Sequence, residues 1–332
     1  MERYRIGIVG GSGFVGFSLA KYFSSFFDVK ILDVKKPRSR LKNITFELCD
    51  IRNYKHVKNT LANVDLVVHT AIVQIPLINA NKRLAYEVNF LGTQNICRAV
   101  DELKNVKGMI LAGSWHTIGE RELSGVVNEE FGFRPDKVED RARLYALSKM
   151  AQETIVRFYD EMSDKIYGII RMGTVLGENM PEKTAANIFI TRGLNGESIT
   201  PYKHSMFRPM LYVDIEDVCK AYERFVRKIL NDELKKTGNS LSHIVNVYYP
   251  EPVTILELAE IVRDAIIKYT NGKLKPSIEI VDKGKSTLYS KEDKKHIKVD
   301  ITKVKKLLGL ERLMSPVESI EKIVKNRLKS VL

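Results

Sequence analysis

The protein has 332 residues, which is long enough for one large domain or two modest ones. No stretch of about 18 consecutive apolar residues occurs, so the sequence predicts no membrane-spanning helix. The net charge of +13 is spread along the chain without interleaved aromatic residues, which argues against a nucleic-acid partner. The three cysteines lie in apolar segments without metal-ligand spacing, which indicates no bound metal and a reducing cytoplasm: Cys49, Cys97 and Cys219.

The N-terminal segment predicts a loop that binds a dinucleotide. Residues 4–9 read as a short buried strand, which leaves no room for a signal peptide before it. Residues 17–23 read as a helix. Between them, the glycines permit a tight turn, close approach to a pyrophosphate and close helix packing. The loop residues that we expect to contact the cofactor are Gly10, Gly13, Phe14, Val15 and Gly16.

A carboxylate after the second predicted strand indicates which dinucleotide binds. Residues 28–32 read as a strand, and Asp33 follows, 17 residues after Gly16. This spacing suits a carboxylate that binds the ribose hydroxyls of NAD. A basic stretch follows that would attract the 2′-phosphate of NADP: Lys35, Lys36, Arg38, Arg40 and Lys42. Because Asp33 would repel that phosphate at close range, we predict NAD.

Three residues further along the chain predict proton transfer. Tyr145 and Lys149 are four apart in a segment that reads as helix, so they share a face. An ammonium beside a phenol favours the phenolate, which predicts that Tyr145 exchanges a proton near neutral pH. Ser114 ends a predicted strand and is placed to steady the same substrate oxygen. Together these groups suit removal of a proton from an alcohol as hydride leaves its carbon.

These motifs resemble the extended short-chain dehydrogenase/reductases of the NAD-dependent epimerase/dehydratase family, and the resemblance covers nearly the whole chain. Further matches are residues 49–51, the strand at 65–71, the Asn-x-x-Gly-Thr-x-Asn motif at 89–95, the strand at 109–114 with Gly119, and the tail at 300–303 with Leu308 and Gly309. Two departures are Val9 in place of the usual threonine and Ile72 in place of a second alanine.

The resemblance implies roles for particular residues. Tyr145 would be the acid/base, Lys149 its partner and a ligand of the nicotinamide ribose, and Ser114 the helper hydroxyl. Asp50, with Ile51 beside it, would contact the adenine. Ala71 would begin a loop beside the cofactor.

We predict an α/β fold: a doubly wound parallel sheet of the Rossmann type with a smaller C-terminal α/β substrate lobe. The NAD-binding domain is expected at residues 1–172, with 213–250 returning to it. Residues 173–212 and 251–332 are expected to form one lobe over the sugar site. In this second half we predict strands at 166–171, 242–248 and 277–281, and helices at 213–227, at 252–267 with a Thr254–Glu257 capping box, and from Ser315 onward.

The loop after Ser114 bears on the reaction. In sugar-nucleotide 4,6-dehydratases the next two residues are usually Asp and Glu, whereas here they are Trp115 and His116. Dehydration is therefore discounted, while 4-epimerases need no such pair. Residues 114–119 and 171–174 also resemble loops of uronate dehydrogenases. Those enzymes have an arginine nine residues after the position of Thr174, and here that position is Lys183, which is also cationic. The resemblance places Trp115 and His116 on a loop that faces the sugar and so implies substrate contacts for both. His116 is expected either to bond a sugar hydroxyl or to be a structural loop histidine.

Other residues favour a nucleotide-linked substrate. Arg208 resembles the arginine that clamps a diphosphate in this family, although Pro209 replaces the following Asp. Thr174 stands where many epimerases have a substrate-binding Asn. Three hypotheses stay open: epimerisation of a nucleotide-diphosphate sugar at the 4-position through a keto intermediate, net oxidation of a sugar or uronate, and a non-catalytic NAD-binding regulator.

The sequence also predicts a homodimer. The predicted helices near 86–103 and 146–162 carry apolar residues on more than one face, including Phe90 and Phe158. One face must cover the sheet, and an exposed second face usually marks an interface. The resembling family commonly pairs these two helices in a dimer contact.

Overall fold

The computed structural model describes residues 3–39 and 43–331. Arg40 and Lys42 of the basic stretch lie outside the described residues. The chain forms two compact units. Unit 1 consists of residues 1–119, 132–171 and 219–246, and unit 2 of residues 120–131, 172–218 and 247–332. The grouping of residues 120–131 with the second unit was not predicted from the sequence.

Unit 1 is built on a seven-stranded sheet in the order β11-β7-β5-β4-β1-β2-β3. β1 pairs in parallel with β2 and β4, and β2–β3 and β4–β5 are also parallel. The order reverses beside β1, as in doubly wound folds that bind a ligand at that point. The predicted fold class is confirmed. The strands are β1 (Arg5–Val9), β2 (Asp28–Asp33), β3 (Ile44–Leu48), β4 (Leu66–His69), β5 (Gly108–Ser114), β7 (Ile166–Met172) and β11 (Ile244–Val247).

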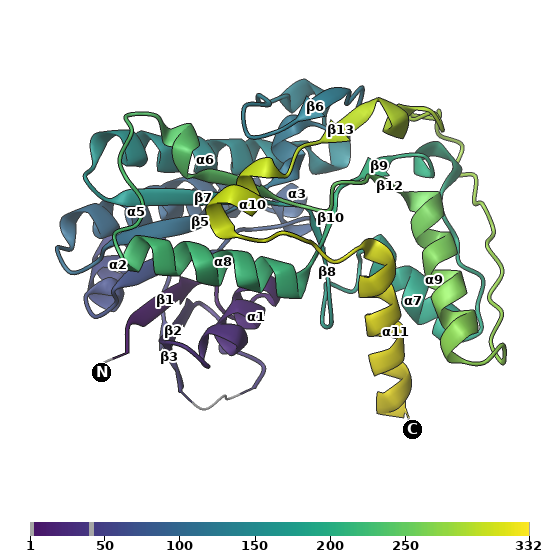
Figure 1. The fold of residues 1–332 in the computed structure, drawn as a ribbon, viewed down its shortest axis with the longest axis horizontal. Coiled ribbons are helices and arrows are strands. Elements are labelled where there is room, and N and C mark those ends of the chain that lie inside the picture. The colour runs from purple at the N-terminus through teal and green to yellow at the C-terminus, as the bar shows by residue number, and fades with distance from the viewer. Residues whose placement is uncertain (1–2, 40–42, 332) are drawn as a thin grey trace. The chain divides into compact units, whose positions relative to one another are not determined.

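Helices pack on this sheet in two groups. The helices α2 (Tyr54–Leu61), α5 (Thr93–Glu102) and α6 (Arg143–Met162) lie side by side. The helices α1 (Phe14–Phe23) and α8 (Ile215–Leu230) lie near each other, and the Arg227 guanidinium sits 5.4 Å from the ring centroid of Phe26 just after α1. In the view of Figure 1, α8 crosses in front of the strands. Shorter helical segments are α3 (Leu77–Ala80), α4 (Lys82–Tyr86) and the π-helical η1 (Glu87–Gly92).

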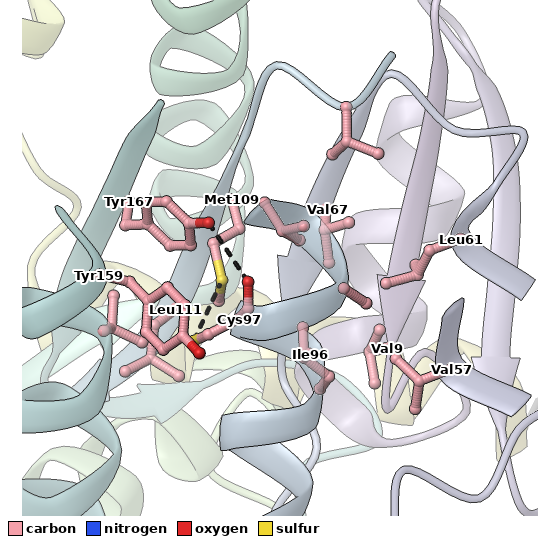
Figure 2. Close-up of a cluster of buried hydrophobic side chains, with 14 of the residues drawn as sticks. Val9, Val57, Leu61, Val67, Ile96, Cys97, Met109, Leu111, Tyr159 and Tyr167 are labelled. Atoms are coloured by element: carbon pink, nitrogen blue, oxygen red, sulfur yellow. Dashed lines mark hydrogen bonds between the residues drawn. The ribbon is translucent and has the colours of Figure 1, made fainter. Parts of the chain in front are cut away.

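One apolar cluster holds the first group of helices to the sheet. Val57 and Leu61 of α2, Ile96 and Cys97 of α5, and Tyr159 of α6 meet strand residues in it (Figure 2). The Tyr167 hydroxyl on β7 donates to the Cys97 carbonyl oxygen at 3.2 Å, which satisfies its buried polar group. Burial of this apolar surface stabilises the fold by about 25 cal/mol for each Å². The thiols of Cys49, Cys97 and Cys219 are buried, as their apolar sequence segments indicate.

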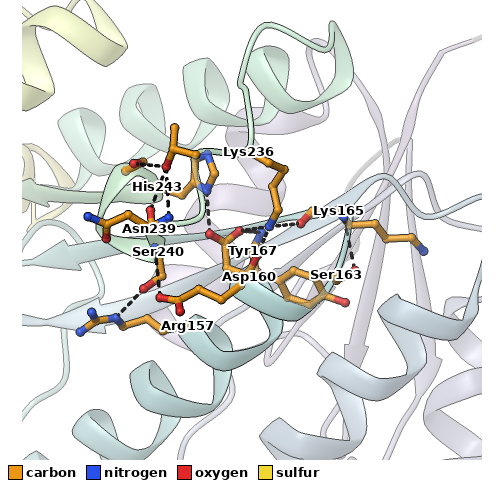
Figure 3. A network of polar contacts seen from close by, with 12 residues as sticks. Arg157, Asp160, Ser163, Lys165, Tyr167, Lys236, Asn239, Ser240 and His243 are labelled. Atoms are coloured by element: carbon orange, nitrogen blue, oxygen red, sulfur yellow. Dashed lines mark hydrogen bonds and ion pairs between the residues drawn. The ribbon is translucent and has the colours of Figure 1, made fainter.

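A polar cluster ties the C-terminal end of α6 to the segment before β11 (Figure 3). The Asp160 carboxylate accepts from His243 Nδ1 at 2.8 Å, from Lys236 Nζ at 2.9 Å and from the Tyr167 amide at 2.9 Å. His243 Nε2 donates to the Lys235 carbonyl oxygen at 3.1 Å. We call Asp160, His243, Lys236 and the Tyr167 amide the Asp160 cluster. Both Asp160 and His243 are buried.

Unit 2 combines helices with three short strand pairs. α9 (Ile255–Tyr269) packs against α7 (Ala185–Leu194) and α11 (Pro316–Val331), and α10 (Thr302–Leu308) ends at Gly309. The Thr254–Glu257 capping box predicted for α9 is confirmed. The strand pairs are β8 (Thr174–Leu176) with β10 (Tyr212–Asp214), β9 (Pro209–Met210) with β12 (Val253–Thr254), and β6 (Gly125–Val127) with β13 (Ile297–Val299).

Two predicted elements differ from the structure. The strand predicted at 277–281 forms only isolated parallel bridges, from Ile278 to Ile199 and from Val281 to Tyr202. Its partner segment contains Pro201, which has no N–H to donate, so the ladder is interrupted. The motif at 89–95 was expected to be plain α-helix, but η1 covers its first four residues. Such π-helical turns often occur at functional sites.

Candidate active site

The glycine loop joins β1 to α1 at the reversal point of the sheet. Gly10 has a φ of 77°, and a Cβ at this position would lie 2.5 Å from the Ala71 backbone nitrogen. A Cβ at Gly16 would lie 2.4 Å from the Gly10 carbonyl oxygen. Glycine is therefore required at both positions, and the loop after β4 closes directly on the loop after β1.

The open side of this loop suits a pyrophosphate. Gly13 is exposed, and a Cβ there would meet only the Gly10 carbonyl oxygen at 3.4 Å. Phe14 and Val15 form the first turn of α1, whose backbone N–H groups have no partners within the helix. A helix N-terminus of this kind attracts an anion. These residues fit the pyrophosphate of a dinucleotide.

Backbone amides hold Asp33 beside the same loop. Its carboxylate accepts from the Ser12 amide at 3.0 Å and from the Lys35 amide at 3.1 Å. The Ser12 hydroxyl donates to the Lys35 carbonyl oxygen at 2.6 Å, which fixes the two loops together. A partly buried carboxylate in this position fits the ribose hydroxyls of NAD.

Asp50 and Ile51 follow β3. The Asp50 carboxylate pairs with Arg52 at 2.6 Å, which together with its other hydrogen bonds lowers the pKa of Asp50 although burial opposes this. Ile51 is buried and supports η1, since a Cβ at Gly92 would lie 2.5 Å from its side chain. An adenine contact by Asp50 stays a prediction, and the sequence argument overlooked Arg52 as its neighbour.

Ser114 and Tyr145 meet as the sequence argument requires. Ser114 ends β5 and is buried, and its side chain hydrogen-bonds to the Tyr145 side chain on α6. Burial raises the pKa of Tyr145, while the hydrogen bond from Ser114 lowers it. We expected Lys149 to bring the pKa of Tyr145 toward neutrality, and this expectation is corrected: burial dominates in the protein without ligand.

Lys149 lies in a dry environment on the same helix. Its side chain is buried, and Nζ donates to the Ala112 carbonyl oxygen at 2.7 Å and to Gln152 Oε1 at 3.0 Å. Burial lowers the pKa of Lys149 to about 7. The group that changes charge near neutral pH is therefore the lysine rather than the tyrosine.

A hydrogen-bonded cluster that the sequence analysis missed surrounds Lys149. Gln152 Nε2 donates to Thr93 Oγ1 at 2.9 Å and to the Ala71 carbonyl oxygen at 3.3 Å. His69 Nε2 lies 3.0 Å from Thr93 Oγ1. Burial, and next the charge of Lys149, lower the pKa of His69 to about 3, so its ring is neutral. Asn89 of η1 continues the cluster by donating to Ser148 Oγ at 3.1 Å.

Trp115 and His116 occupy the 3₁₀ turn η2 (Trp115–Ile118) after Ser114. His116 Nδ1 lies 3.3 Å from Ser114 Oγ, and the His116 ring packs edge-on at 5.6 Å from the Tyr145 ring. His116 thus lies beside both proposed proton-transfer groups. Trp115 is only 1% exposed and its ring lies 4.8 Å from that of His116. This burial favours support of His116 over the direct sugar contact that the resemblance implies for Trp115.

The remaining predicted substrate residues belong to unit 2. The Thr174 amide on β8 donates to the Leu211 carbonyl oxygen at 2.7 Å, which places Thr174 beside the strands that follow Arg208. Arg208 is 9% exposed. Lys183 is exposed and lies two residues before α7 begins. The structure thus brings Thr174 and the Arg208 segment together, and it places Lys183 in a separate, solvent-exposed stretch.

Residues 6–239 match the model of the NAD dependent epimerase/dehydratase family. The chain belongs to this family. It is therefore an enzyme, and its cofactor is NAD. The resemblance drawn from the motifs is confirmed. No metal-binding group of three or more His, Cys, Asp or Glu residues, and no helix that could cross a membrane, occurs in the part of the chain that the structure describes.

Several relatives of the chain carry the names of nucleotide-sugar enzymes. It is 24% identical to UDP-glucuronic acid decarboxylase 1 of Danio rerio, over 97% of this chain and 72% of that protein. It is 26% identical to a putative UDP-glucose 4-epimerase of Methanocaldococcus jannaschii, over 78% of this chain and 81% of that protein. The structure of Thermus thermophilus UDP-glucose 4-epimerase with NAD has a TM-score of 0.77, with 21% identity, over 99% of this chain and 100% of that chain. This last likeness shows the shared fold.

Proposed function

We propose that the enzyme epimerises a nucleotide-diphosphate sugar at the 4-position through a keto intermediate. The observation that carries this proposal is the hydrogen-bonded pair of Ser114 and Tyr145, with Lys149 one turn further along α6. Ser114 ends β5 of the same sheet whose β1 leads into the glycine loop and whose β2 ends at Asp33, and Tyr145 lies on α6. Trp115 and His116 stand where a dehydratase would have its carboxylate pair, which is why elimination of water is not proposed.

In this proposal Tyr145 accepts the proton of the sugar hydroxyl and later returns it. Ser114 holds the same sugar oxygen by a hydrogen bond. Lys149 in its charged form favours the tyrosinate by electrostatic attraction. Gly10, Gly13, Gly16 and Asp33 would hold NAD, which supplies the hydride acceptor and donor. Since the proton and the hydride both return to the sugar, the cycle has no net redox change.

The nucleotide part of the proposal is supported by charge. Arg208 is nearly buried in unit 2, where an arginine fork suits a diphosphate. The net charge of +13 would also attract a doubly charged diphosphate. UDP-sugars occur in the names of the relatives described above.

Net oxidation of a sugar or uronate is the second candidate. It is favoured by His116, which lies 3.3 Å from Ser114 Oγ and packs on the Tyr145 ring. In this alternative His116 bonds a ring hydroxyl, and Lys183 pairs with the carboxylate of the substrate.

A substrate panel separates the candidates. The enzyme is incubated with NAD and, in parallel, with UDP-glucose, UDP-galactose, free glucose and free glucuronate, while NADH absorbance and sugar products are followed together. Epimerised UDP-sugar without accumulated NADH supports the proposal. Stoichiometric NADH with a free sugar or uronate supports the dehydrogenase and contradicts epimerisation. Tight NAD binding with no product in any arm would contradict both candidates for these substrates.

Two substitutions in unit 2 sharpen this test. Arg208→Ala should raise KM for a UDP-sugar, because the diphosphate loses its clamp. Lys183→Ala should raise KM for glucuronate but little for a neutral sugar, since a close ion pair is worth about 1.5 kcal/mol or more. A change in KM below about threefold for both variants, less than about 0.7 kcal/mol, would contradict the assignment of both residues to the substrate.

We also propose that the enzyme is a homodimer. Several large apolar side chains on α4, η1 and α6 are exposed, including Tyr86, Leu91, Phe158 and Met162. Phe158 is 68% exposed, while Val156 beside it is buried, so α6 carries apolar side chains on two faces. A second copy would cover the exposed face. Sedimentation at micromolar concentration should give the dimer mass, and Phe158→Lys should shift it toward the monomer. A monomer mass for the unmodified protein would contradict this proposal.

A further inference from the structure

We propose that Gln152 is a positioning residue that fixes the Lys149 amine against the end of β5. This inference rests on the proposed role of Lys149 and adds a residue that the motifs do not include. Gln152 lies on α6, one turn after Lys149, and is fully buried. Its carboxamide contacts Lys149 on the same helix and two other segments of unit 1, at Ala71 and Thr93, which meet it only in the folded protein.

The donors and acceptors around the Gln152 carboxamide determine its orientation. The Thr93 hydroxyl has one proton and donates it to the Asn89 carbonyl oxygen at 2.8 Å, so it faces Gln152 as an acceptor. The Ala71 carbonyl oxygen is also an acceptor. Gln152 must therefore direct its NH₂ group at these two oxygens, at 2.9 Å and 3.3 Å. A flipped amide would place its oxygen against both acceptors.

This orientation leaves Gln152 Oε1 facing Lys149 Nζ at 3.0 Å. The Ala112 carbonyl oxygen holds the same nitrogen at 2.7 Å from β5. Two of the three N–H donors of the ammonium are thereby directed at fixed acceptors, and one is left for a ligand. Because Ala71 follows β4 and lies against Gly10, Gln152 also couples the amine to the loop that closes on the glycine loop.

Other ionisable groups near Lys149 do not account for its charge change near neutral pH. Tyr145 lies one turn before it on α6, and burial raises the pKa of that phenol. His69 on β4 is neutral because burial lowers its pKa to about 3. Glu153 is held in a buried ion pair with Arg171 of β7, with its Oε2 3.0 Å from Arg171 Nε. His116 also lies in the site, packed on the Tyr145 ring, so a pH-dependent change between pH 6 and pH 9 reports on Lys149 when it persists in a His116→Asn background.

NAD binding provides a measurement that needs no sugar substrate. The protein has a single tryptophan, Trp115, which lies in the site, so its fluorescence follows NAD titrations at each pH. Gln152→Met keeps the side-chain length but removes the acceptor. It should weaken NAD binding roughly tenfold, which corresponds to about 1.4 kcal/mol, and move the pH midpoint of binding downward. Gln152→Glu places a carboxylate beside the amine and should move the midpoint upward.

Controls separate this inference from a simple loss of structure. Gln94→Met is the matched control, because Gln94 donates to the Tyr159 hydroxyl at 2.8 Å, outside the Lys149 cluster. It should leave NAD affinity and its pH midpoint unchanged. Thr93→Val removes the hydroxyl that orients Gln152 and should shift the midpoint in the same direction as Gln152→Met, by less. Thermal unfolding of each variant establishes that it is folded.

Opposite midpoint shifts for Gln152→Met and Gln152→Glu would support the inference. Unchanged affinity and midpoint in both variants, while Lys149→Met weakens NAD binding, would overturn it and leave the proposed role of Lys149 standing. If Lys149→Met itself leaves NAD affinity unchanged, the proposed role of Lys149 is wrong, and the role of Gln152 is overturned with it.

Discussion

The two ends of α6 hold lysine amines in opposite ways. Near the N-terminal end, Lys149 Nζ contacts only neutral oxygens in the described residues, those of Ala112 and Gln152. At the C-terminal end, the amine of Lys236 lies 2.9 Å from the Asp160 carboxylate, which also binds His243 (Figure 3). Neutral acceptors leave the charge of Lys149 sensitive to its surroundings, and its pKa falls to about 7. A carboxylate partner instead favours the ammonium form.

The two ends of α6 therefore suit different roles: the end with Lys149 suits proton transfer, and the end with Asp160 joins two segments of the chain. A group that must exchange protons needs a pKa near the working pH, which burial without a counter-ion provides. A group that joins two segments needs a partner of opposite charge. Each end of α6 can therefore be disturbed separately, and the results should differ in kind: turnover at one end, stability at the other.

The largest effect should follow from Tyr145→Phe. Loss of the phenolic proton donor should lower kcat by about 10²- to 10⁴-fold, the usual range for general acid–base catalysis. NAD affinity and the unfolding temperature should stay close to those of the unmodified enzyme, because the ring remains. Turnover on the substrate found in the panel, measured beside NAD titration, checks this. Near-normal turnover would show that Tyr145 is not the acid/base.

The opposite pattern is expected from Asp160→Asn. Removing this charge leaves the buried His243 and the exposed Lys236 without their carboxylate, and loss of the buried Asp160–His243 contact should cost about 3 kcal/mol of unfolding free energy. Burial raises the pKa of Asp160, but hydrogen bonds from His243 and the Tyr167 amide outweigh it and lower the pKa overall. The stabilisation is thus present above the ordinary pKa of an aspartate and is lost as the pH falls through the folded-state pKa.

Urea unfolding of Asp160→Asn should therefore differ from that of the unmodified protein at pH 7 and converge with it in acid. NAD affinity should change little, because the Asp160 cluster lies at the far end of α6 from Lys149. A variant with normal stability at pH 7 would show that the cluster does not anchor the helix. A stable variant that lost NAD binding would break the separation between the two ends.

The same contrast explains which parts of the site could be predicted from sequence. The glycine loop, Asp33 and the Tyr145–Lys149 pair are set by short spacings within one strand, turn or helix. The doubly wound parallel sheet followed from recognising these local units as those of a known family. Gln152, by contrast, acts through contacts to residues 71 and 93, which lie far from it in sequence. No local pattern marks such a residue.

The burial of Tyr145 and Lys149 also could not be predicted from their spacing in the sequence. Helical spacing brought Lys149 one turn from Tyr145, and an ammonium there was expected to lower the pKa of the phenol. The structure shows that desolvation acts on both groups, raising the pKa of Tyr145 and lowering that of Lys149. The strand expected at 277–281 was wrong for a similar reason, since the interruption comes from Pro201 in a distant partner segment.

Lys149→Met should show activity and stability changing in opposite directions. At neutral pH the buried amine carries a desolvation cost, and removing it should stabilise the fold by about 2 kcal/mol after the lost hydrogen bonds are counted. The folded-state pKa of Lys149 is about 7, below its ordinary value of 10.5, so the stability of the unmodified enzyme should rise with pH between these values. The advantage of the variant should therefore shrink as the pH is raised.

Unfolding free energies at pH 7 and pH 9 check this expectation. Turnover and NAD affinity should both fall in the same variant, because Lys149 is proposed to contact the nicotinamide ribose. If Lys149→Met is less stable than the unmodified enzyme at both pH values, the amine contributes to anchoring and the contrast with Lys236 is wrong.

The smallest effect concerns a second contrast of the same type, between Asp33 and Asp160. Asp160 is bound by the side chains of Lys236 and His243, whereas the Asp33 carboxylate accepts from the backbone amides of Ser12 and Lys35. Its negative charge is thus available to accept from ribose hydroxyls and to repel a 2′-phosphate.

Asp33→Ser should reduce the preference for NAD over NADP by about tenfold, or about 1.4 kcal/mol, aided by the nearby Lys35 and Lys36. Parallel titrations with both cofactors measure the ratio, and Asp33→Asn, which keeps the size but loses the charge, separates repulsion from shape. If the unmodified enzyme binds NADP as tightly as NAD, Asp33 does not select the cofactor, because its repulsion would then be offset by the lysines beside it.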